Sequence, residues 1–150
     1  MTTPTIIAST APAKFVPQND ITDIVTYTVP TATAADAVIG MIPFKKGCRL
    51  VSGWIQVADL DLGTTVTLDV GYVYVTGSTG TDNSDAFIDN STLPQAGGIA
   101  TFPVASGLST STELSTSGAA DDGYFVIVIK SDPTEQAGAV TLCMTMNYGQ

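Results

Sequence analysis

The sequence predicts an all-β protein, a single-domain β-sandwich or jelly-roll-like antiparallel barrel, and three observations support this prediction. Threonine, valine and isoleucine, whose branched β-carbons suit strands, are abundant. Apolar and polar residues alternate in several runs of the chain. No run of comparable length has apolar residues at the 3.6-residue spacing of a helix. At 150 residues the chain is long enough to bury one core without help from disulfides or metals.

The alternating runs define the strands of a body that covers residues 21–150. We expect strands over 21–29, 38–42, 50–58, 64–75, 123–130 and 140–148. The run 123–130 is apolar on both faces, which is typical of a central strand. In the run 50–58, Val51, Ile55 and Val57 share one face and Trp54 lies on the other. The core is expected to contain Val25, Tyr27, Leu68, Val70, Phe125, Ile127, Leu142 and Met144.

Residues 77–120 are rich in glycine, serine and threonine and are expected to form a long connection. The best helical segment of the chain is Asp85–Ser91, with Ser84 or Asp82 as its N-cap. One or two short strands are expected nearby, at 99–102 and at 111–115.

Residues 1–20 differ from the body and read either as an extended N-terminal arm or as a frayed terminus. Pro4, Pro12 and Pro17 exclude a helix or a central strand. The arm also contains the apolar pair Ile6 and Ile7, and we expect the prolines to prevent it from folding on itself. Ile6 and Ile7 are therefore predicted to bind a neighbouring protein, and deletion of the arm is expected to leave the stability of the body nearly unchanged.

Composition excludes several functional classes. The chain has no histidine, which removes the Ser-His-Asp and Cys-His nucleophile systems and the usual general base. A net charge of −9 argues against binding of nucleic acid, because affinity for phosphates depends on positive charge. The longest apolar run, 125–129, is too short to span a membrane. We therefore expect no enzymatic activity and no catalytic residue.

The beginning of the chain shows no secretory signal, so we expect synthesis in a reducing cytoplasm. The two cysteines, Cys48 and Cys143, are 95 positions apart and form no Cys-x-x-Cys motif. They are predicted to be reduced, small core residues that are not bonded to each other.

Three acidic groupings could suggest chemistry, but each has a simpler interpretation. Asp59 and Asp61, followed by Gly63, could begin a calcium loop, yet the glutamate that such a loop needs at its twelfth position is absent. The groups 82–85 and 121–123 read as turns. We expect no metal and no cofactor. Trp54 is predicted to be a core or interface residue, with sugar stacking as the alternative.

The basic residues are concentrated in one place. Lys45, Lys46 and Arg49 fall within five positions, in a chain that has only five lysines and arginines. This turn is either a solvated loop or a docking contact for an acidic partner, acting through electrostatic steering.

These residues together resemble a known class of protein. The sequence is similar over residues 21–148 to small virion structural proteins of tailed bacteriophages, of the kind that decorate or cement the head. The segments that carry this resemblance are 37–43 (AVIGMIP), 46–51 (KGCRLV), 59–61 (DLD), 67–72 (TLDVGY), 83–88 (NSDAFI), 95–98 (QAGG) and 137–142 (AGAVTL).

The resemblance implies a β-sandwich or jelly-roll body, homo-oligomers that are often trimers, and no enzymatic activity. It also implies that the major capsid protein is the partner and that the chain lies in the virion, on the outer surface of the head. We therefore expect a capsid decoration protein. The alternative from another class is a carbohydrate- or host-surface-binding module of a virion fibre or tail.

Overall fold

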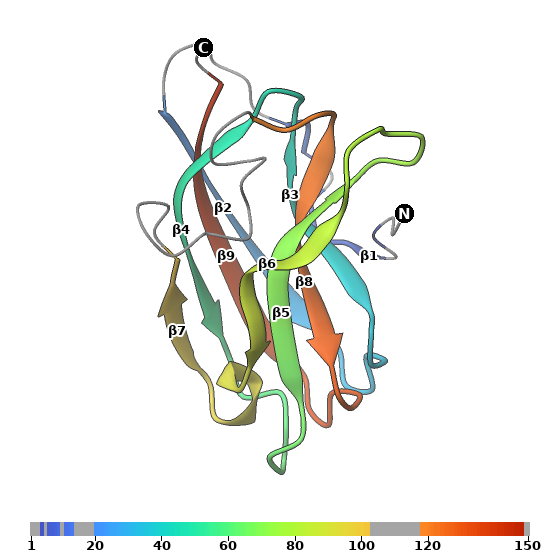
Figure 1. Ribbon diagram of the computed structural model, residues 1–150. Helices are drawn as coiled ribbons and strands as arrows, with labels where there is room; N and C mark the ends of the chain where they lie inside the picture. Colours follow the sequence, from blue (N-terminus) through green and yellow to red (C-terminus); the bar gives the residue numbers. More distant parts are fainter. Residues whose placement is uncertain (1–3, 5, 10, 14–19, 103–117, 149–150) are drawn as a thin grey trace.

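The computed structural model describes residues 4, 6–9, 11–13, 20–102 and 118–148, which form two β-sheets packed face to face (Figure 1). The strands are β1 (Ile6–Ile7), β2 (Asp20–Val29), β3 (Val38–Phe44), β4 (Arg49–Val57), β5 (Thr67–Tyr74), β6 (Asn83–Ser91), β7 (Gly98–Thr101), β8 (Gly123–Lys130) and β9 (Gly138–Asn147). Sheet A has the order β1-β3-β8-β5-β6, and sheet B has the order β2-β9-β4-β7. The predicted all-β sandwich is confirmed.

The strands of the body pair in a nested way, so that segments distant in the sequence lie side by side. Strand β2 pairs with β9, β3 with β8, β4 with β7 and β5 with β6. The longest ladder runs from Asp20 opposite Asn147 to Val29 opposite Gly138. The described residues contain no helix of the length and apolarity needed to cross a membrane; their single helical element is a 3-10 turn, Leu93–Gln95.

The inner faces of the two sheets share one core. Of the predicted core residues, six are buried: Leu68, Val70, Phe125, Ile127, Leu142 and Met144. The other two, Val25 and Tyr27, are half-buried and pack against this core from β2, which lies at the edge of sheet B. An edge strand has a neighbour on one side only, so its inward side chains are less fully covered.

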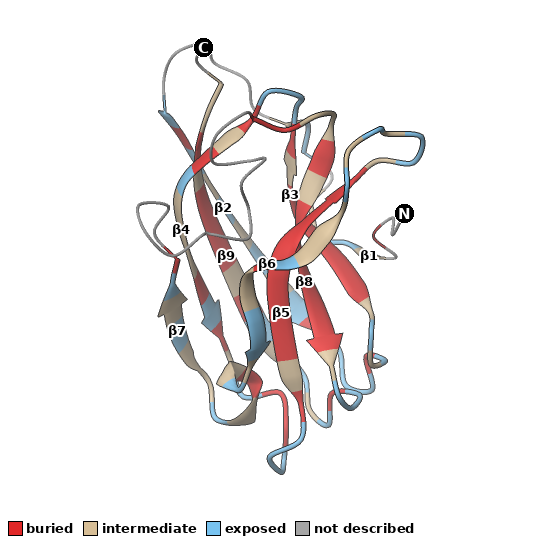
Figure 2. Ribbon diagram, in the orientation of Figure 1, coloured by how far each residue is buried: buried red, intermediate tan, exposed pale blue. Residues whose placement is uncertain are grey.

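Strand β8 is buried on both faces, as its apolar sequence predicts (Figure 2). Its inward residues join the main core, while Val126 and Val128 pack with Val38 and Val73 in a second cluster on the outer face of sheet A. A strand in the middle of a sheet therefore has a cover on each side.

The prediction that Val51 shares the buried face of β4 is wrong. The register of β4 against β9 shifts between Leu50 and Ser52, where an extra residue is inserted. A bulge of this kind exchanges the faces of the residues before and after it. Leu50 is consequently buried, and Val51 is 39% exposed.

The predicted helix at Asp85–Ser91 is also wrong, because these residues belong to strand β6. Strand β6 pairs with the edge of β5, and its register shifts twice along that ladder. The shifts break the two-residue alternation that would have revealed a strand. The short strand expected at 99–102 is present as β7. The one expected at 111–115 lies outside the described residues.

The described part of the arm packs on its own body, contrary to the expectation that its prolines prevent this. Ile6 and Ile7 form β1, which pairs in parallel with Ile39 and Gly40 at the edge of sheet A. Ile6 packs against the core, and the Ala8 N–H donates to the Gly40 carbonyl over 2.8 Å. The prolines remove hydrogen-bond donors only at their own positions, so the residues between them can still pair.

Candidate docking site

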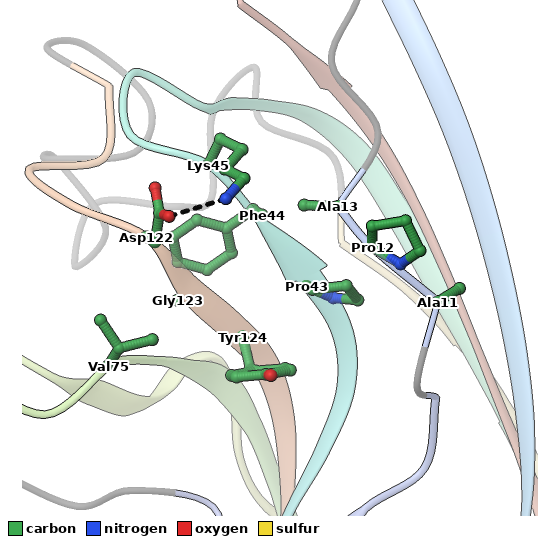
Figure 3. Close-up of a pocket in the computed structure, with 10 residues that line it drawn as sticks. All are labelled: Ala11, Pro12, Ala13, Pro43, Phe44, Lys45, Val75, Asp122, Gly123 and Tyr124. Atoms are coloured by element: carbon green, nitrogen blue, oxygen red, sulfur yellow. Dashed lines mark hydrogen bonds and ion pairs between the residues drawn. The ribbon is translucent and has the colours of Figure 1, made fainter.

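The basic turn between β3 and β4 is held in shape by an aspartate from a distant part of the chain. The Lys45 ammonium lies 2.9 Å from Asp122 Oδ2 (Figure 3). The Lys46 N–H donates to Asp122 Oδ1 over 3.0 Å. The hydrogen-bonded ion pair with Lys45, and to a smaller extent the hydrogen bond from Lys46, hold the pKa of the Asp122 carboxyl below its usual range. Asp122 thus stays ionised and fixes the turn from the start of β8.

The three predicted cations do not form one uniform patch. The charge of Lys45 is partly offset by Asp122, although both side chains remain accessible to water. Lys46 is exposed at the tip of the turn. Arg49 is half-buried at the start of β4, in register with Asn147 on sheet B. The structure therefore places Lys45 and Lys46 together at one end of the sandwich and Arg49 beside them on a different surface.

Tyr148 and Cys48 pack beneath the basic turn on its buried side. The Lys45 N–H donates to the Tyr148 hydroxyl over 2.9 Å. Burial raises the pKa of Tyr148 well above its usual range, so the group is a neutral hydroxyl. Burial also raises the pKa of the Cys48 thiol to about 12. Both Cys48 and Cys143 are unbonded and buried, which confirms the prediction that they form no disulfide.

The arm meets the basic turn at one hollow. Ala11, Pro12 and Ala13 line one side of it, and Pro43, Phe44, Lys45, Val75, Asp122, Gly123 and Tyr124 line the rest (Figure 3). Its volume is about 330 Å³. Two features that the sequence analysis singled out separately, the arm and the turn, therefore lie side by side. We call this place, with Lys46 at its rim, the arm–turn site.

Sequence reasoning missed two residues of the arm–turn site. It assigned Asp122 to a turn before the central strand and placed Tyr148 among the alternating residues of the last strand. Neither position carried a signal for a contact with Lys45, because 77 and 103 residues separate the bonded pairs. The Asp-Asp-Gly sequence at 121–123 indicates a turn, but it does not show that Asp122 contacts the basic turn.

The carboxylates of Asp59 and Asp61, which could have suggested a metal site, accept hydrogen bonds from backbone N–H groups of their own loop. Asp61 is buried, and its carboxylate accepts N–H groups of Gly63, Thr65 and Val66 at 2.7–2.8 Å. These hydrogen bonds, with that from Val66 the strongest influence, lower the pKa of Asp61. Asp59 accepts the N–H of Asp61 at 3.0 Å. Across the part of the chain that the structure describes, no three histidine, cysteine, aspartate or glutamate side chains gather as metal ligands would.

Asp82 and Asp85 do not form a site either. Asp82 Oδ1 accepts the N–H of Tyr74 over 2.8 Å, which ties the β5–β6 connection to β5. Asp85 is exposed on β6. Trp54 is half-buried on the outer face of sheet B and lines a second hollow of about 380 Å³.

Comparison with known proteins finds similarity in structure alone. No family model matches the sequence, and no curated protein matches it. The fold is shared with chains of bacteriophage capsids. A chain in the capsid of Ralstonia phage GP4 is 23% identical, with a TM-score of 0.72 over 95% of this chain and 92% of that one.

Two further capsid structures contain similar chains. In the capsid asymmetric unit of cyanophage Pam1 the identity is 16% and the TM-score 0.62, over 92% of this chain and 91% of that one. In the acidic stable capsid of Helicobacter pylori bacteriophage KHP30 the values are 10% and 0.50, over 87% and 94%. At these identities the likeness establishes the fold.

Proposed function

We propose that the chain is a non-enzymatic structural protein of a bacteriophage virion, which decorates and stabilises the capsid by binding the outer face of the major capsid protein lattice. We assign its nested strand pairing to the jelly-roll topology. The observation that carries the proposal is the arm–turn site, in a fold shared with three phage capsid chains. The chain would be made in the host cytoplasm and act as a homo-oligomer, with a trimer as the form that the sequence resemblance implies.

The arm–turn site has the properties of a docking contact. It is a hollow with a positive group beside it, and the same arm carries an exposed apolar residue on β1. Ile7 is 40% exposed, and Lys46 is exposed at the tip of the turn. Because the rest of the chain is strongly acidic, Lys46 would steer this end toward an acidic surface of the lattice. Ile7 and the hollow would then supply apolar burial.

Cosedimentation with empty heads that lack the protein tests the proposal. We expect saturable binding of the wild type, and Lys46→Ala should weaken it about 2- to 5-fold at low salt, as loss of one exposed ion pair predicts. The difference should shrink above about 0.1 M salt, where exposed charges are screened beyond about 10 Å. Ala137→Asp is the matched control, since it makes the same charge change at an exposed position in the turn before β9. Failure of the wild type to sediment with heads would contradict the proposal.

A second function rests on the hollow beside Trp54. An indole next to Thr22, Ser52 and Thr101 could stack on a sugar and offer it hydroxyl groups. This is the carbohydrate- or host-surface-binding alternative. Quenching of Trp54 fluorescence by glycans of the host surface, in a protein that does not cosediment with heads, would favour carbohydrate binding over capsid decoration.

A further inference from the structure

The outer face of sheet B is uncharged across most of its area. Registers across the sheet place Ile24, Cys143, Trp54 and Thr101 in one row. The rows on either side of it consist of threonine, serine, glutamine and isoleucine. The first outward charges occur at the end of the sheet, where Asp20 and Arg49 flank Asn147. In a chain of net charge −9, a neutral face of this size is unusual.

This face also exposes large apolar side chains. Ile24 on β2 is 56% exposed, and Ile99 on β7 is 63% exposed. They lie at opposite edges of the sheet, on either side of the hollow beside Trp54. The other large apolar residues that are exposed are Ile7 on β1, Leu62 in the β4–β5 loop and Val51 at the bulge near the start of β4. The two edges of sheet B therefore each present an exposed isoleucine, with a depression between them.

Four hydroxyl groups of the face are already paired within the chain. The hydroxyl oxygens of Thr22 and Thr145 are 2.9 Å apart, and those of Thr26 and Thr141 are 2.8 Å apart. A hydroxyl that keeps a hydrogen-bond partner loses less on transfer from water than one that is left unpaired. The face can therefore be covered at a lower desolvation cost than its threonine content suggests.

The net charge of the chain and the area of the outer face of sheet B both point to a second copy of the chain as its partner. Two copies of a chain with net charge −9 repel each other, and on this face they can meet with few carboxylates between them. The nearest are Asp20 at the end of the sheet and Asp23 on the edge strand β2. The charge of Asp23 adds to burial in raising the pKa of the Cys143 thiol. Its strands hold about 33 residues, which at about 3.3 Å per residue and 4.8 Å between strands gives about 500 Å² for each copy. Two copies would bury about 1,000 Å² in total, which is about the minimum for a specific interface.

We propose that the outer face of sheet B is a subunit interface, covered by a second copy of this chain. Ile24 and Ile99 are the apolar contacts, and the hollow beside Trp54 receives a side chain of the partner copy. Tryptophan in a desolvated depression is a common centre of interface affinity. The proposal rests on the homo-oligomer of the proposed function and names its interface, and it is tested on the isolated protein, so that it can fail while binding to heads is retained.

Sedimentation equilibrium of the purified full-length chain tests this interface. The wild type should sediment with a multiple of the 15.4 kDa chain mass at micromolar concentration. The double variant Ile24→Asp, Ile99→Asp should sediment as one chain, because the charges would be buried and would repel their copies. Leu62→Asp is the matched control. Leu62 is 76% exposed in the β4–β5 loop, and this variant should associate like the wild type.

Thermal unfolding of the double variant at a concentration where the wild type is dissociated should show a midpoint within a few degrees of the wild type, since both positions are exposed. A shift of that size confirms that loss of association is not loss of folding. The proposal is overturned if the wild type is a monomer throughout the concentration range. It is equally overturned if the double variant associates as strongly as the wild type, or if Leu62→Asp dissociates the oligomer to the same extent.

Discussion

The outer faces of the two sheets differ sharply, although the inner faces share one core. On sheet A, Val73 and Val126 have no exposed surface. On sheet B, Ile24 and Ile99 are more than half exposed. The sequence of each face matches its environment, because valine predominates on the first and threonine on the second.

The chain itself covers sheet A. Pro4 and Ile7 of the arm lie over Gly40, where an added β-carbon would come within 3.1 Å of both side chains. The backbone of Asn83 crosses over Gly71 so closely that a β-carbon there would collide with it. Sheet B has no such cover among the described residues. Sheet A is thus covered by its own chain, whereas sheet B is open among the described residues, and it is at sheet B and the arm–turn site that we propose partners bind.

The largest losses of stability are expected from truncations in the shared core. They should be similar in both sheets, because the sheets differ only in their outer faces. Ile127→Ala in sheet A and Leu142→Ala in sheet B should each reduce the free energy of unfolding by about 2–5 kcal/mol, because both side chains are fully buried. Denaturant unfolding monitored by circular dichroism measures this loss. A loss below about 0.5 kcal/mol at both sites would show that the inward faces are assigned incorrectly.

The outer faces should respond very differently to the same kind of truncation. Val126→Ala removes buried methyl groups and should cost about 1.5–3 kcal/mol. Ile24→Ala on sheet B should change the free energy of unfolding by less than about 0.5 kcal/mol in the dissociated protein, because the side chain is already exposed. Equal losses at the two positions would remove the distinction between a covered and an open face.

Deletion of the arm segment that covers part of sheet A should lower the free energy of unfolding by less than truncation of the core but by more than a change at an exposed position. Deletion of residues 1–8 removes Pro4, which is buried, and Ile6, which packs against the core. We expect a loss of about 1–3 kcal/mol in the free energy of unfolding. This replaces the expectation from sequence that the arm contributes nothing to the body. An unchanged thermal midpoint in the truncated protein would restore the original expectation.

Two buried aspartates, Asp69 and Asp61, should change the stability of the protein in opposite directions as the pH falls. Asp69, on the outer face of sheet A, has its pKa raised, mainly by burial, despite a hydrogen bond from the Asn90 N–H. Its protonated form is favoured by folding, so the wild type should gain stability relative to Asp69→Asn as the pH falls from neutral through the raised folded-state pKa.

Asp61 has a lowered pKa, so its contribution is present above the unfolded value of about 3.9 and is lost as the pH falls through the folded-state value. The deficit of Asp61→Asn should therefore be largest at neutral pH and shrink in acid. The free energy of unfolding, measured between neutral pH and about pH 3 for the wild type and both variants, gives the two slopes. Slopes of the same sign for the two residues would contradict the assigned environments.

The sequence predicts the parts of this fold that repeat regularly. Strands β5, β8 and β9 follow from two-residue alternation, and the double burial of β8 follows from its apolar character. Strand β6 escapes this reasoning because its register shifts break the alternation. Val51 escapes it because one inserted residue exchanges the faces of β4.

Long-range contacts could not be predicted. Two residues of β1 pair with β3 more than 30 positions away, and no local pattern encodes this parallel contact. The same holds for Asp122 and Tyr148, which convert the basic turn into a shaped surface. The sequence therefore singles out Ile6, Ile7, Lys45, Lys46 and Arg49 as candidate partner-binding residues, but it does not show that the arm and the turn line one hollow.

We propose above that the chain binds the outer surface of a phage head through its arm–turn site. Electron cryomicroscopy of empty heads, with and without added protein, tests it most directly. We expect extra density on the outer surface, into which the sandwich fits with Lys46 and Ile7 toward the lattice and the loop around Leu62 toward solvent. Heads that gain no density, or density in which the Leu62 loop contacts the lattice and the arm–turn site faces outward, would contradict this mode of binding.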